Sequence, residues 1–263
     1  MATRSLDARG PRVTLAPMFP IRDHNPSGIV PVVTWALIAL NVAVQLYVST
    51  LPDRAVWGLY GAYALVPLEV AQGRGWGTLV SSAFLHAGWL HLGGNMLFLW
   101  IFGDNVEAAL GRLGFLLFYL LAAVGAGLAQ VLADPLSPIP TIGASGAVAG
   151  VMGGYLLLFP RARVDLLLFL VVVVRVIPVP AWIVLAVWVG GQAVQGALVD
   201  TSGGGVAYWA HVGGFAAGLL LMVVPWLRRG GPAFWALTHG APPHPEAAYG
   251  RLAPTRVPVV RRR

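Results

Sequence analysis

Long apolar segments alternate with short polar segments along the chain, and this pattern is typical of a polytopic membrane protein. A helix needs about 20 apolar residues to cross the roughly 30 Å hydrocarbon core of a bilayer. We predict six such spans, at 29–51, 92–110, 115–132, 145–159, 180–198 and 206–227. The fourth span is short and rich in glycine, which favours a helix packed inside a bundle over one that faces lipid. The predicted fold class is an all-α membrane protein, a bundle of six transmembrane helices.

Other segments do not fit the pattern of a span. Residues 164–179 are apolar but contain Arg175 and Pro178, so we predict a membrane-skimming connection into the fifth span. Residues 52–90 mix polar side chains with tryptophan and tyrosine, which favour the membrane interface. We expect this segment to form a half-embedded external loop between the first two helices. The chain then divides into a cytoplasmic segment 1–28, a membrane domain 29–227, and a basic tail 228–263, rich in proline, glycine and arginine, that we expect to be disordered.

Composition strengthens the membrane assignment and fixes an orientation. The chain has 263 residues, of which 57% are hydrophobic and 10% charged, whereas soluble domains carry about 25% charged residues. The absence of cysteine excludes a disulfide framework, a cysteine nucleophile and thiolate metal sites. If the N-terminus is cytoplasmic, 15 of the 17 basic residues lie inside and only Arg54 and Arg74 lie outside. This bias predicts that both termini are cytoplasmic.

Polar side chains inside the predicted spans are few, and such residues usually mark function or helix contacts. His91 and Asn95 open the second span and are four residues apart, on one helix face. Ser145 opens the fourth span within Gly143-Ala144-Ser145-Gly146, and His211 lies in the sixth. These three spans all run from outside to inside in the predicted orientation. His211 is then roughly 8 Å below the outer surface, so the four residues share one depth range and could line one pocket.

Helical phase supports the same pocket. His211, Gly214 and Gly218 share one face of the sixth span, and a face of mostly small residues follows Ser145 in the fourth. Small faces let two helix backbones approach closely, which would bring the Ser145 hydroxyl within hydrogen-bond reach of the His211 imidazole. A serine beside a base is the minimum for nucleophilic catalysis. The helix start at Ser145, together with Asn95 and His91, could hold an oxyanion. Taken singly, each of these residues is more often a packing or helix-contact residue.

The three motifs together resemble those of the rhomboid intramembrane serine proteases. Gly143-Ala144-Ser145-Gly146 matches the family's GxSG, His91 to Asn95 its HxxxN, and Ala210-His211 with Gly214 and Gly218 its AHxxGxxxG. His86 and the stretch 103–111 with Glu107 are similar to the surroundings of the family's second helix, and residues 18–26 to the start of many bacterial members. The resemblance covers about residues 18–227.

The resemblance implies a function and roles for the residues. Ser145 would be the nucleophile and His211 the general base, in a dyad with no acidic third member, and Asn95, His91 and the Ser145 backbone N–H would stabilise the oxyanion. Gly143, Gly146, Gly214, Gly218 and Glu107 would be structural motif residues. The chain departs from many members at Trp76-Gly77, where they have Trp-Arg, so Arg74 is a candidate replacement. A second departure is Ala149, where some members stack a tyrosine on the histidine.

We therefore predict a serine endopeptidase that cuts single-span or polytopic membrane proteins in or next to their transmembrane segments. Its site would open to the outer side of a membrane, which by the resemblance would be a bacterial plasma membrane. No metal, organic cofactor or nucleic-acid partner is expected, because the chain lacks an HExxH motif and Gly103-Asp104 lacks the pattern of aspartyl intramembrane proteases. The sequence does not indicate an oligomeric state.

Two alternatives belong to other classes of function. A non-catalytic relative that binds membrane clients would be expected to lose Ser145 or His211, and this chain keeps both. A small transporter would carry a polar site near the midplane, built from repeated halves. No such repeat is visible in the sequence.

Overall fold

The computed structural model describes residues 18–24, 27–170, 173–200 and 203–245. Its longer helices are α1 (Val32–Ser49), α2 (Asp53–Tyr63), α5 (Trp89–Ala133), α6 (Ser145–Leu158), α7 (Ala181–Leu198) and α8 (Tyr208–Arg228). The shorter ones are α3 (Pro67–Ala71), α4 (Thr78–Ser81), η1 (Ser82–Phe84) and α9 (Pro232–Thr238). Strands β1 (Met18–Asp23), β2 (Arg163–Leu170) and β3 (Val173–Pro180) complete the fold.

The mostly helical architecture that the sequence predicts is confirmed. Helices α1, α5, α7 and α8 are long and apolar enough to cross a membrane, and α6 is a shorter apolar helix. Helix α5 contains two of the predicted spans. They are separated by a break in its backbone at Gly111, where φ is 72°. Such a φ is readily adopted by glycine and rarely by other residues. Helical segments therefore lie at all six predicted spans.

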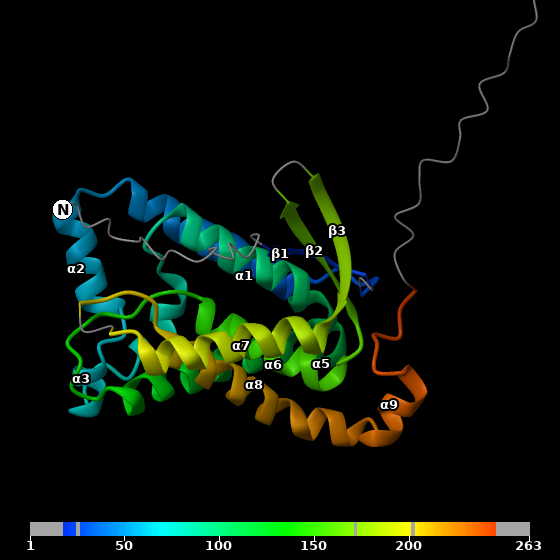
Figure 1. Cartoon of the computed structure of the whole chain (residues 1–263). Helices are drawn as coiled ribbons and strands as arrows, with labels where there is room; N and C mark the ends of the chain where they lie inside the picture. The colour runs from blue at the N-terminus through cyan, green and yellow to red at the C-terminus, as the bar shows by residue number, and fades with distance from the viewer. Residues whose placement is uncertain (1–17, 25–26, 171–172, 201–202, 246–263) are drawn as a thin grey trace, which may run out of the picture.

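Helices α5, α6 and α8 form the centre of the bundle, and small residues allow them to pack closely (Figure 1). A Cβ atom on Gly214 would lie 2.0 Å from the backbone oxygen of Gly146, and one on Gly218 would lie 1.9 Å from that of Gly150. On its other side, Gly146 packs against Ala126 of α5. Close backbone approach of this kind is typical of small-residue contacts between membrane helices. These contacts set the distance between the start of α6 and the first turn of α8.

A buried carboxylate on α5 caps the first helix. Helix α1 begins after Pro31 and has no side-chain cap of its own. The Glu107 carboxylate instead accepts hydrogen bonds from the backbone N–H groups of Val33 and Thr34, at 2.9 and 2.8 Å, and from the Thr34 hydroxyl. A negative charge at a helix N-terminus satisfies free N–H groups and interacts favourably with the helix dipole. Glu107 thus ties α1 to the second predicted span.

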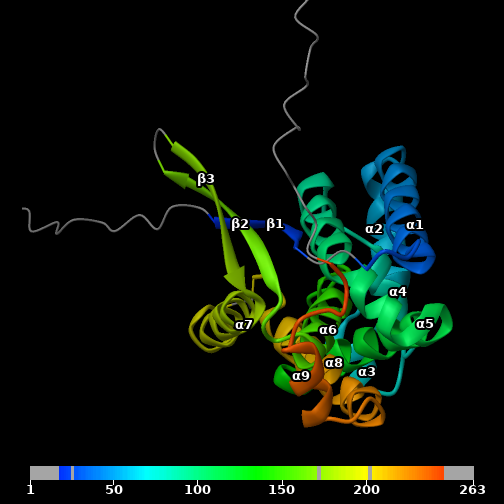
Figure 2. The same cartoon turned by 90° about the vertical axis from the view of Figure 1, so that its right-hand side faces the viewer.

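The segment 163–180 is a β-hairpin, whereas the sequence led us to expect an irregular connection that skims the membrane. Strands β2 and β3 pair antiparallel, and β1 adds to the free edge of β2 to give the order β1-β2-β3. The predicted boundary of the N-terminal segment at residue 28 therefore separates two parts that fold together. Figures 1 and 2 show the hairpin projecting away from the helices at the end of the bundle that carries α9.

Buried polar contacts anchor this sheet to the helices. Asp23, at the end of β1, accepts hydrogen bonds from the Tyr155 hydroxyl of α6 at 2.8 Å and from the Asn105 amide of α5 at 2.7 Å. Asp165 of β2 is paired with Arg22 and His24. Paired and hydrogen-bonded carboxylates can remain buried where isolated ones cannot. The beginning of the described chain is therefore attached to the same helix that begins at Ser145.

The C-terminal tail begins with a helix, which corrects part of the prediction that residues 228–263 are disordered. Pro232 stands in the first turn of α9, where a missing N–H costs nothing. The Trp235 indole N–H donates to the Leu157 carbonyl at 2.9 Å, and Phe234 packs near Phe159. These aromatic contacts with the end of α6 hold the segment in place. The remainder of the tail, 246–263, lies outside the described residues.

Candidate active site

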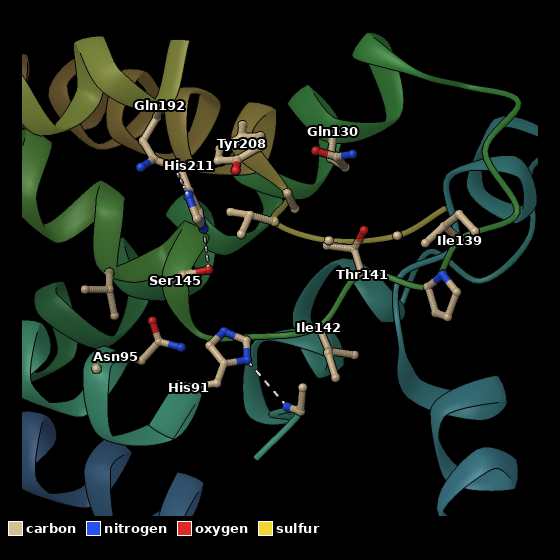
Figure 3. Close-up of a pocket in the computed structure, with 18 of the residues that line it drawn as sticks. His91, Asn95, Gln130, Ile139, Thr141, Ile142, Ser145, Gln192, Tyr208 and His211 are labelled. Atoms are coloured by element: carbon tan, nitrogen blue, oxygen red, sulfur yellow. Dashed lines mark hydrogen bonds between the residues drawn. The ribbon is translucent and has the colours of Figure 1, made fainter. Parts of the chain in front are cut away.

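One large cavity is lined in part by Trp57 and Tyr60 of α2, and α2 lies at the end of the bundle opposite α9 (Figure 1). Its volume is about 860 Å³, and residues of α2, α5, α6, α7 and α8 line it. Ser145, His211, His91 and Asn95 are all among these residues, and Figure 3 shows them gathered on one side of the cavity. The structure thus brings together the four polar residues that the sequence singled out.

Ser145 is the first residue of α6, and the loop before it depends on a glycine. Gly143 has φ of 130°, and a Cβ atom there would lie 2.8 Å from the Cε1 and Nε2 atoms of His91. The Gly143 N–H donates to the Ser82 carbonyl at 2.9 Å, which fixes the loop against η1. Free N–H groups and the positive end of the α6 dipole therefore surround the serine, an arrangement suited to an anion.

The His211 imidazole lies directly against the Ser145 hydroxyl. The distance from Nε2 of His211 to Oγ of Ser145 is 2.8 Å (Figure 3). His211 stands in the first turn of α8, where the backbone contact between Gly214 and Gly146 sets the separation of the two helices. A hydroxyl that donates to an imidazole can lose its proton to that base as it attacks a carbonyl.

His91 and Asn95 offer two hydrogen-bond donors beside the serine. The Ala87 N–H donates to Nδ1 of His91 at 3.4 Å, so the neutral imidazole carries its own proton on Nε2, the atom nearest Gly143. The Asn95 side chain is 8% exposed, and its Nδ2 atom has no hydrogen-bond partner among the residues that the structure describes. A buried donor without a partner is costly, and such groups often serve a ligand or a transition state.

His86 supports the serine loop from the connection between η1 and α5. Its Nε2 atom accepts a hydrogen bond from the Ala144 N–H at 3.4 Å, and its ring meets that of His91 edge to face at 5.1 Å. Burial, and to a smaller extent the neighbouring His91, lowers the pKa of His86 to about 4. His86 is therefore neutral at pH 7 and can act as an acceptor for the loop.

Two residues of α7 contact His211, and the sequence analysis did not identify either. Nδ1 of His211 lies 2.6 Å from Oε1 of Gln192, and the indole of Trp188 lies over the imidazole with ring centroids 5.7 Å apart. Gln192 is a polar residue within a predicted span, so the rule that singled out His91 and Asn95 could have identified it. Ala149 cannot stack on the histidine as the tyrosine of some family members does, and nothing in the sequence indicates that Trp188 lies against the histidine.

Arg74 makes its contacts within the external segment. Its guanidinium donates to Glu69 and to Gln72, both at 2.6 Å. The hydrogen bond from Arg74 is the main reason that the pKa of Glu69 is lowered. Both side chains are exposed, so this pair contributes little to stability. Arg74 therefore stabilises the turn after α3, and these hydrogen bonds do not reach Ser145 or His211.

Family comparison agrees with the fold. Residues 73–228 match the Rhomboid domain, which covers more than half of the chain. The chain belongs to the rhomboid family. It is an integral, multi-pass membrane protein, as the family and the apolar helices both indicate.

Several curated relatives of this rhomboid chain come from yeast, a plant and a bacterium. Rhomboid protein 1, mitochondrial, of Saccharomyces cerevisiae is 32% identical over 210 residues, which is 78% of this chain and 55% of the relative. Rhomboid-like protein 11, chloroplastic, of Arabidopsis thaliana is 37% identical over 43% of this chain and 38% of its own length. Rhomboid protease GluP of Bacillus subtilis is 41% identical over 33% of this chain and 16% of its own. The chain thus spans about half the length of these relatives or less.

The chemistry that the site permits follows from its donor and acceptor set. It offers one hydroxyl, one base on that hydroxyl, and nearby N–H donors, which together suit addition of a serine to a carbonyl. Within the described ranges, no three His, Asp or Glu side chains are close enough to hold a metal ion.

Proposed function

We propose that this rhomboid is an intramembrane serine endopeptidase that hydrolyses peptide bonds in or next to transmembrane segments of membrane-protein substrates. The observation that carries the proposal is the 2.8 Å contact between Nε2 of His211 and Oγ of Ser145 inside a large cavity. The name of the Bacillus subtilis relative, rhomboid protease GluP, supports the same reaction class.

The reaction begins with attack of Ser145 Oγ on the scissile carbonyl carbon. His211 Nε2 takes the hydroxyl proton, and the carbonyl oxygen becomes an oxyanion. We propose that Asn95 Nδ2, His91 Nε2 and the N–H groups at the start of α6 donate to that oxyanion. Such donors are a large part of the catalysis of acyl transfer.

The tetrahedral intermediate then collapses with cleavage of the C–N bond. His211 gives its proton to the leaving amine, which leaves an ester between the substrate acyl group and Ser145. Water enters the cavity and attacks the ester carbonyl carbon while His211 removes one of its protons. The second intermediate collapses, His211 returns that proton to Ser145 Oγ, and the carboxyl product is released. Ser145, His211, the leaving amine and water account for every proton in this cycle.

The substrate has to present an extended segment, because an α-helix uses its own carbonyls in internal hydrogen bonds. A segment with small or helix-weakening residues near the scissile bond therefore fits the cavity best. We propose that the cavity opens on the outer side of the membrane and that both termini are cytoplasmic, which the distribution of arginines supports. A bacterial plasma membrane remains our proposal for the location, and the Bacillus subtilis relative supports it.

Cleavage in liposomes tests the proposal. The wild-type chain, Ser145→Ala and His211→Ala are reconstituted with a single-span test substrate whose transmembrane segment contains glycine and proline, and products are mapped by mass spectrometry. We expect cleavage by the wild type and none by either variant, with all three proteins equally folded. If the wild type cuts no substrate of a helix-weakened panel, or if Ser145→Ala still cuts, the protease proposal is wrong. Crosslinking of uncut substrate would then indicate a client-binding protein.

A further inference from the structure

Both nitrogens of the His211 ring have partners, and the partners differ in what they can do. Nε2 faces the Ser145 hydroxyl at 2.8 Å, and Nδ1 faces Oε1 of Gln192 at 2.6 Å (Figure 3). A neutral imidazole carries one proton, and an amide oxygen can only accept. The proton therefore lies on Nδ1, and the lone pair of Nε2 is directed at the serine hydroxyl.

We propose that Gln192 is a positioning residue for the Ser145–His211 pair, which holds His211 in its Nδ1–H tautomer, and that Trp188 fixes the plane of the ring. This inference rests on the proposed function. Without the acceptor, the ring could carry its proton on Nε2 or rotate, and in neither state could Nε2 receive the proton of Ser145. The partner of the second nitrogen usually decides which tautomer a histidine adopts.

The two residues act from one face of α7. Trp188 and Gln192 are four residues apart, so both side chains lie on the side that faces α8. The indole and imidazole planes are tilted by 32°, with centroids 5.7 Å apart. When His211 takes the serine proton it becomes a cation, and both contacts then strengthen. The hydrogen bond to Gln192 becomes charge-assisted, and the indole face attracts the positive charge.

Apart from these two contacts, the part of α7 near the cavity packs loosely against the rest of the bundle. Of its residues, all of which the structure describes, only Ala181 and Leu185 are buried, and both lie near the end that joins β3. Near the cavity, its polar contacts to α8 are the Gln192–His211 pair and the hydrogen bond from the Tyr208 hydroxyl to Gln195 at 3.1 Å. A shift of the outer half of α7 would therefore remove the acceptor from His211, so the orientation of the base depends on the position of this helix.

Substitutions at Gln192 test the role in the liposome cleavage assay. Gln192→Met keeps the approximate shape of the side chain and removes the acceptor, whereas Gln192→Glu keeps an acceptor oxygen and adds a charge. Gln45→Met is the matched control, because Gln45 is a glutamine on α1 away from the cavity whose buried Oε1 has no partner within the described part of the chain. The measured quantities are kcat and KM as functions of pH.

We expect Gln192→Met to lower kcat about tenfold to hundredfold with little change in KM, the range for losing a hydrogen bond to a charged group. Gln192→Glu should retain activity and move the acid limb of the pH profile to higher pH, because the carboxylate stabilises the imidazolium. Gln45→Met should match the wild type. A purely structural role predicts instead that both Gln192 variants lose thermal stability and that the acid limb does not move. If Gln192→Met keeps kcat within about twofold of wild type, the inference is wrong.

A measurement of the His211 tautomer does not depend on catalysis, so it tests this inference separately from the proposed function. The ¹⁵N chemical shifts of histidine report which ring nitrogen carries the proton, and a His211→Gln sample assigns the His211 signals. We expect the Nδ1–H tautomer in the wild type and loss of that preference in Gln192→Met. An Nε2–H tautomer in the wild type would overturn the inference, even if cleavage is observed. Absence of cleavage together with the Nδ1–H tautomer would overturn the proposed function alone.

Discussion

At the residue scale, Asn95 combines burial and an unpaired donor with a position beside the proposed nucleophile. Its side chain is buried, and its Nδ2 donor has no partner among the described residues although it lies beside Ser145 in the cavity. Leaving a buried donor unpaired costs about 1–3 kcal/mol. An oxyanion formed at Ser145 would supply the missing acceptor. Asn95 would then stabilise the transition state, which carries this charge, more than the ground state, which does not.

We expect Asn95→Ala to lower kcat for the test substrate by about 10²- to 10³-fold, as loss of one oxyanion donor does elsewhere. Thermal stability should be unchanged or slightly higher, because the substitution removes an unpaired polar group. Asn41→Ala is a suitable control, since Asn41 is a buried asparagine of α1 outside the cavity. An Asn95→Ala enzyme with wild-type kcat would show that Asn95 does not contribute to the oxyanion site.

Gly214 tests whether backbone contact between α6 and α8 sets the geometry of the site. A Cβ atom at this position would lie 2.0 Å from the Gly146 oxygen, so Gly214→Ala has to push the helices apart. We expect a loss of about 1–3 kcal/mol in the free energy of unfolding and a large loss of activity. Gly190→Ala on α7 meets nothing within 4 Å and should be neutral or stabilising by about 0.5–1 kcal/mol. Equal unfolding curves for the two variants in detergent would contradict the close-contact account.

The sequence identified a site residue when its side chain is unusual for the segment in which it lies. Ser145, His211, His91 and Asn95 stand out as polar side chains in apolar spans, and helical phase placed them together. Gln192 shares that property, but no motif connects it with His211. Trp188 could not be recognised, because aromatic residues are common in membrane helices and only the packing of α7 on α8 shows which one covers the histidine.

At the scale of elements, the helices were predictable and the sheet was not. Apolar runs of helical length identify spans because a bilayer imposes a fixed thickness. The residues of β2 and β3 are equally apolar, so hydropathy alone did not separate a pair of strands from a membrane segment. The partner strand β1 lies about 140 residues away in the sequence, and such a distant pairing leaves no local signal. Helix α9 was missed because its stability comes from aromatic contacts with the end of α6.

The connection between η1 and α5 should make the protein sensitive to acid through His86. The pKa of His86 is about 4 in the folded protein and 6.5 when unperturbed, so the unfolded chain binds its proton first as the pH falls. Stability from this residue is fully present above pH 6.5 and is lost progressively between pH 6.5 and 4. The total loss is on the order of 3 kcal/mol.

Thermal unfolding in detergent at pH values from 7.5 to 4.5 measures this effect. We expect the midpoint to fall with pH in the wild type and to fall less steeply in His86→Gln. Glutamine does not titrate, and its amide oxygen can still accept from the Ala144 N–H. Identical pH dependence in the two proteins would mean that other groups cause the acid sensitivity.

At the scale of the whole molecule, function depends on which end of the bundle faces outward. The cavity, α2 and α3 lie at one end, and α9 and the hairpin lie at the other (Figure 1). We propose, from the arginine bias, that the second end is cytoplasmic. A protease that acts at the outer surface and a protease that acts at the inner surface would meet different substrates, so this orientation decides the class of accessible substrate.

The absence of cysteine makes the orientation simple to measure, because an introduced cysteine is the only thiol of the chain. Ala71→Cys places one at the exposed end of α3, and Leu237→Cys places one on the exposed side of α9, where Leu237 is 81% exposed. In intact bacterial cells we expect an impermeant maleimide to label position 71, and to label position 237 only after the membrane is permeabilised. The reverse pattern would overturn the proposed topology.

The central claim is that His211 activates Ser145 as a nucleophile, and the most direct measurement is mass spectrometry of the protein after reaction with a fluorophosphonate. This reagent forms a stable phosphonyl ester with an activated serine. The account predicts a single adduct that maps to Ser145 in the wild type and is absent from His211→Ala. No adduct in the folded wild type, an adduct on another serine, or undiminished labelling of Ser145 in His211→Ala would contradict it.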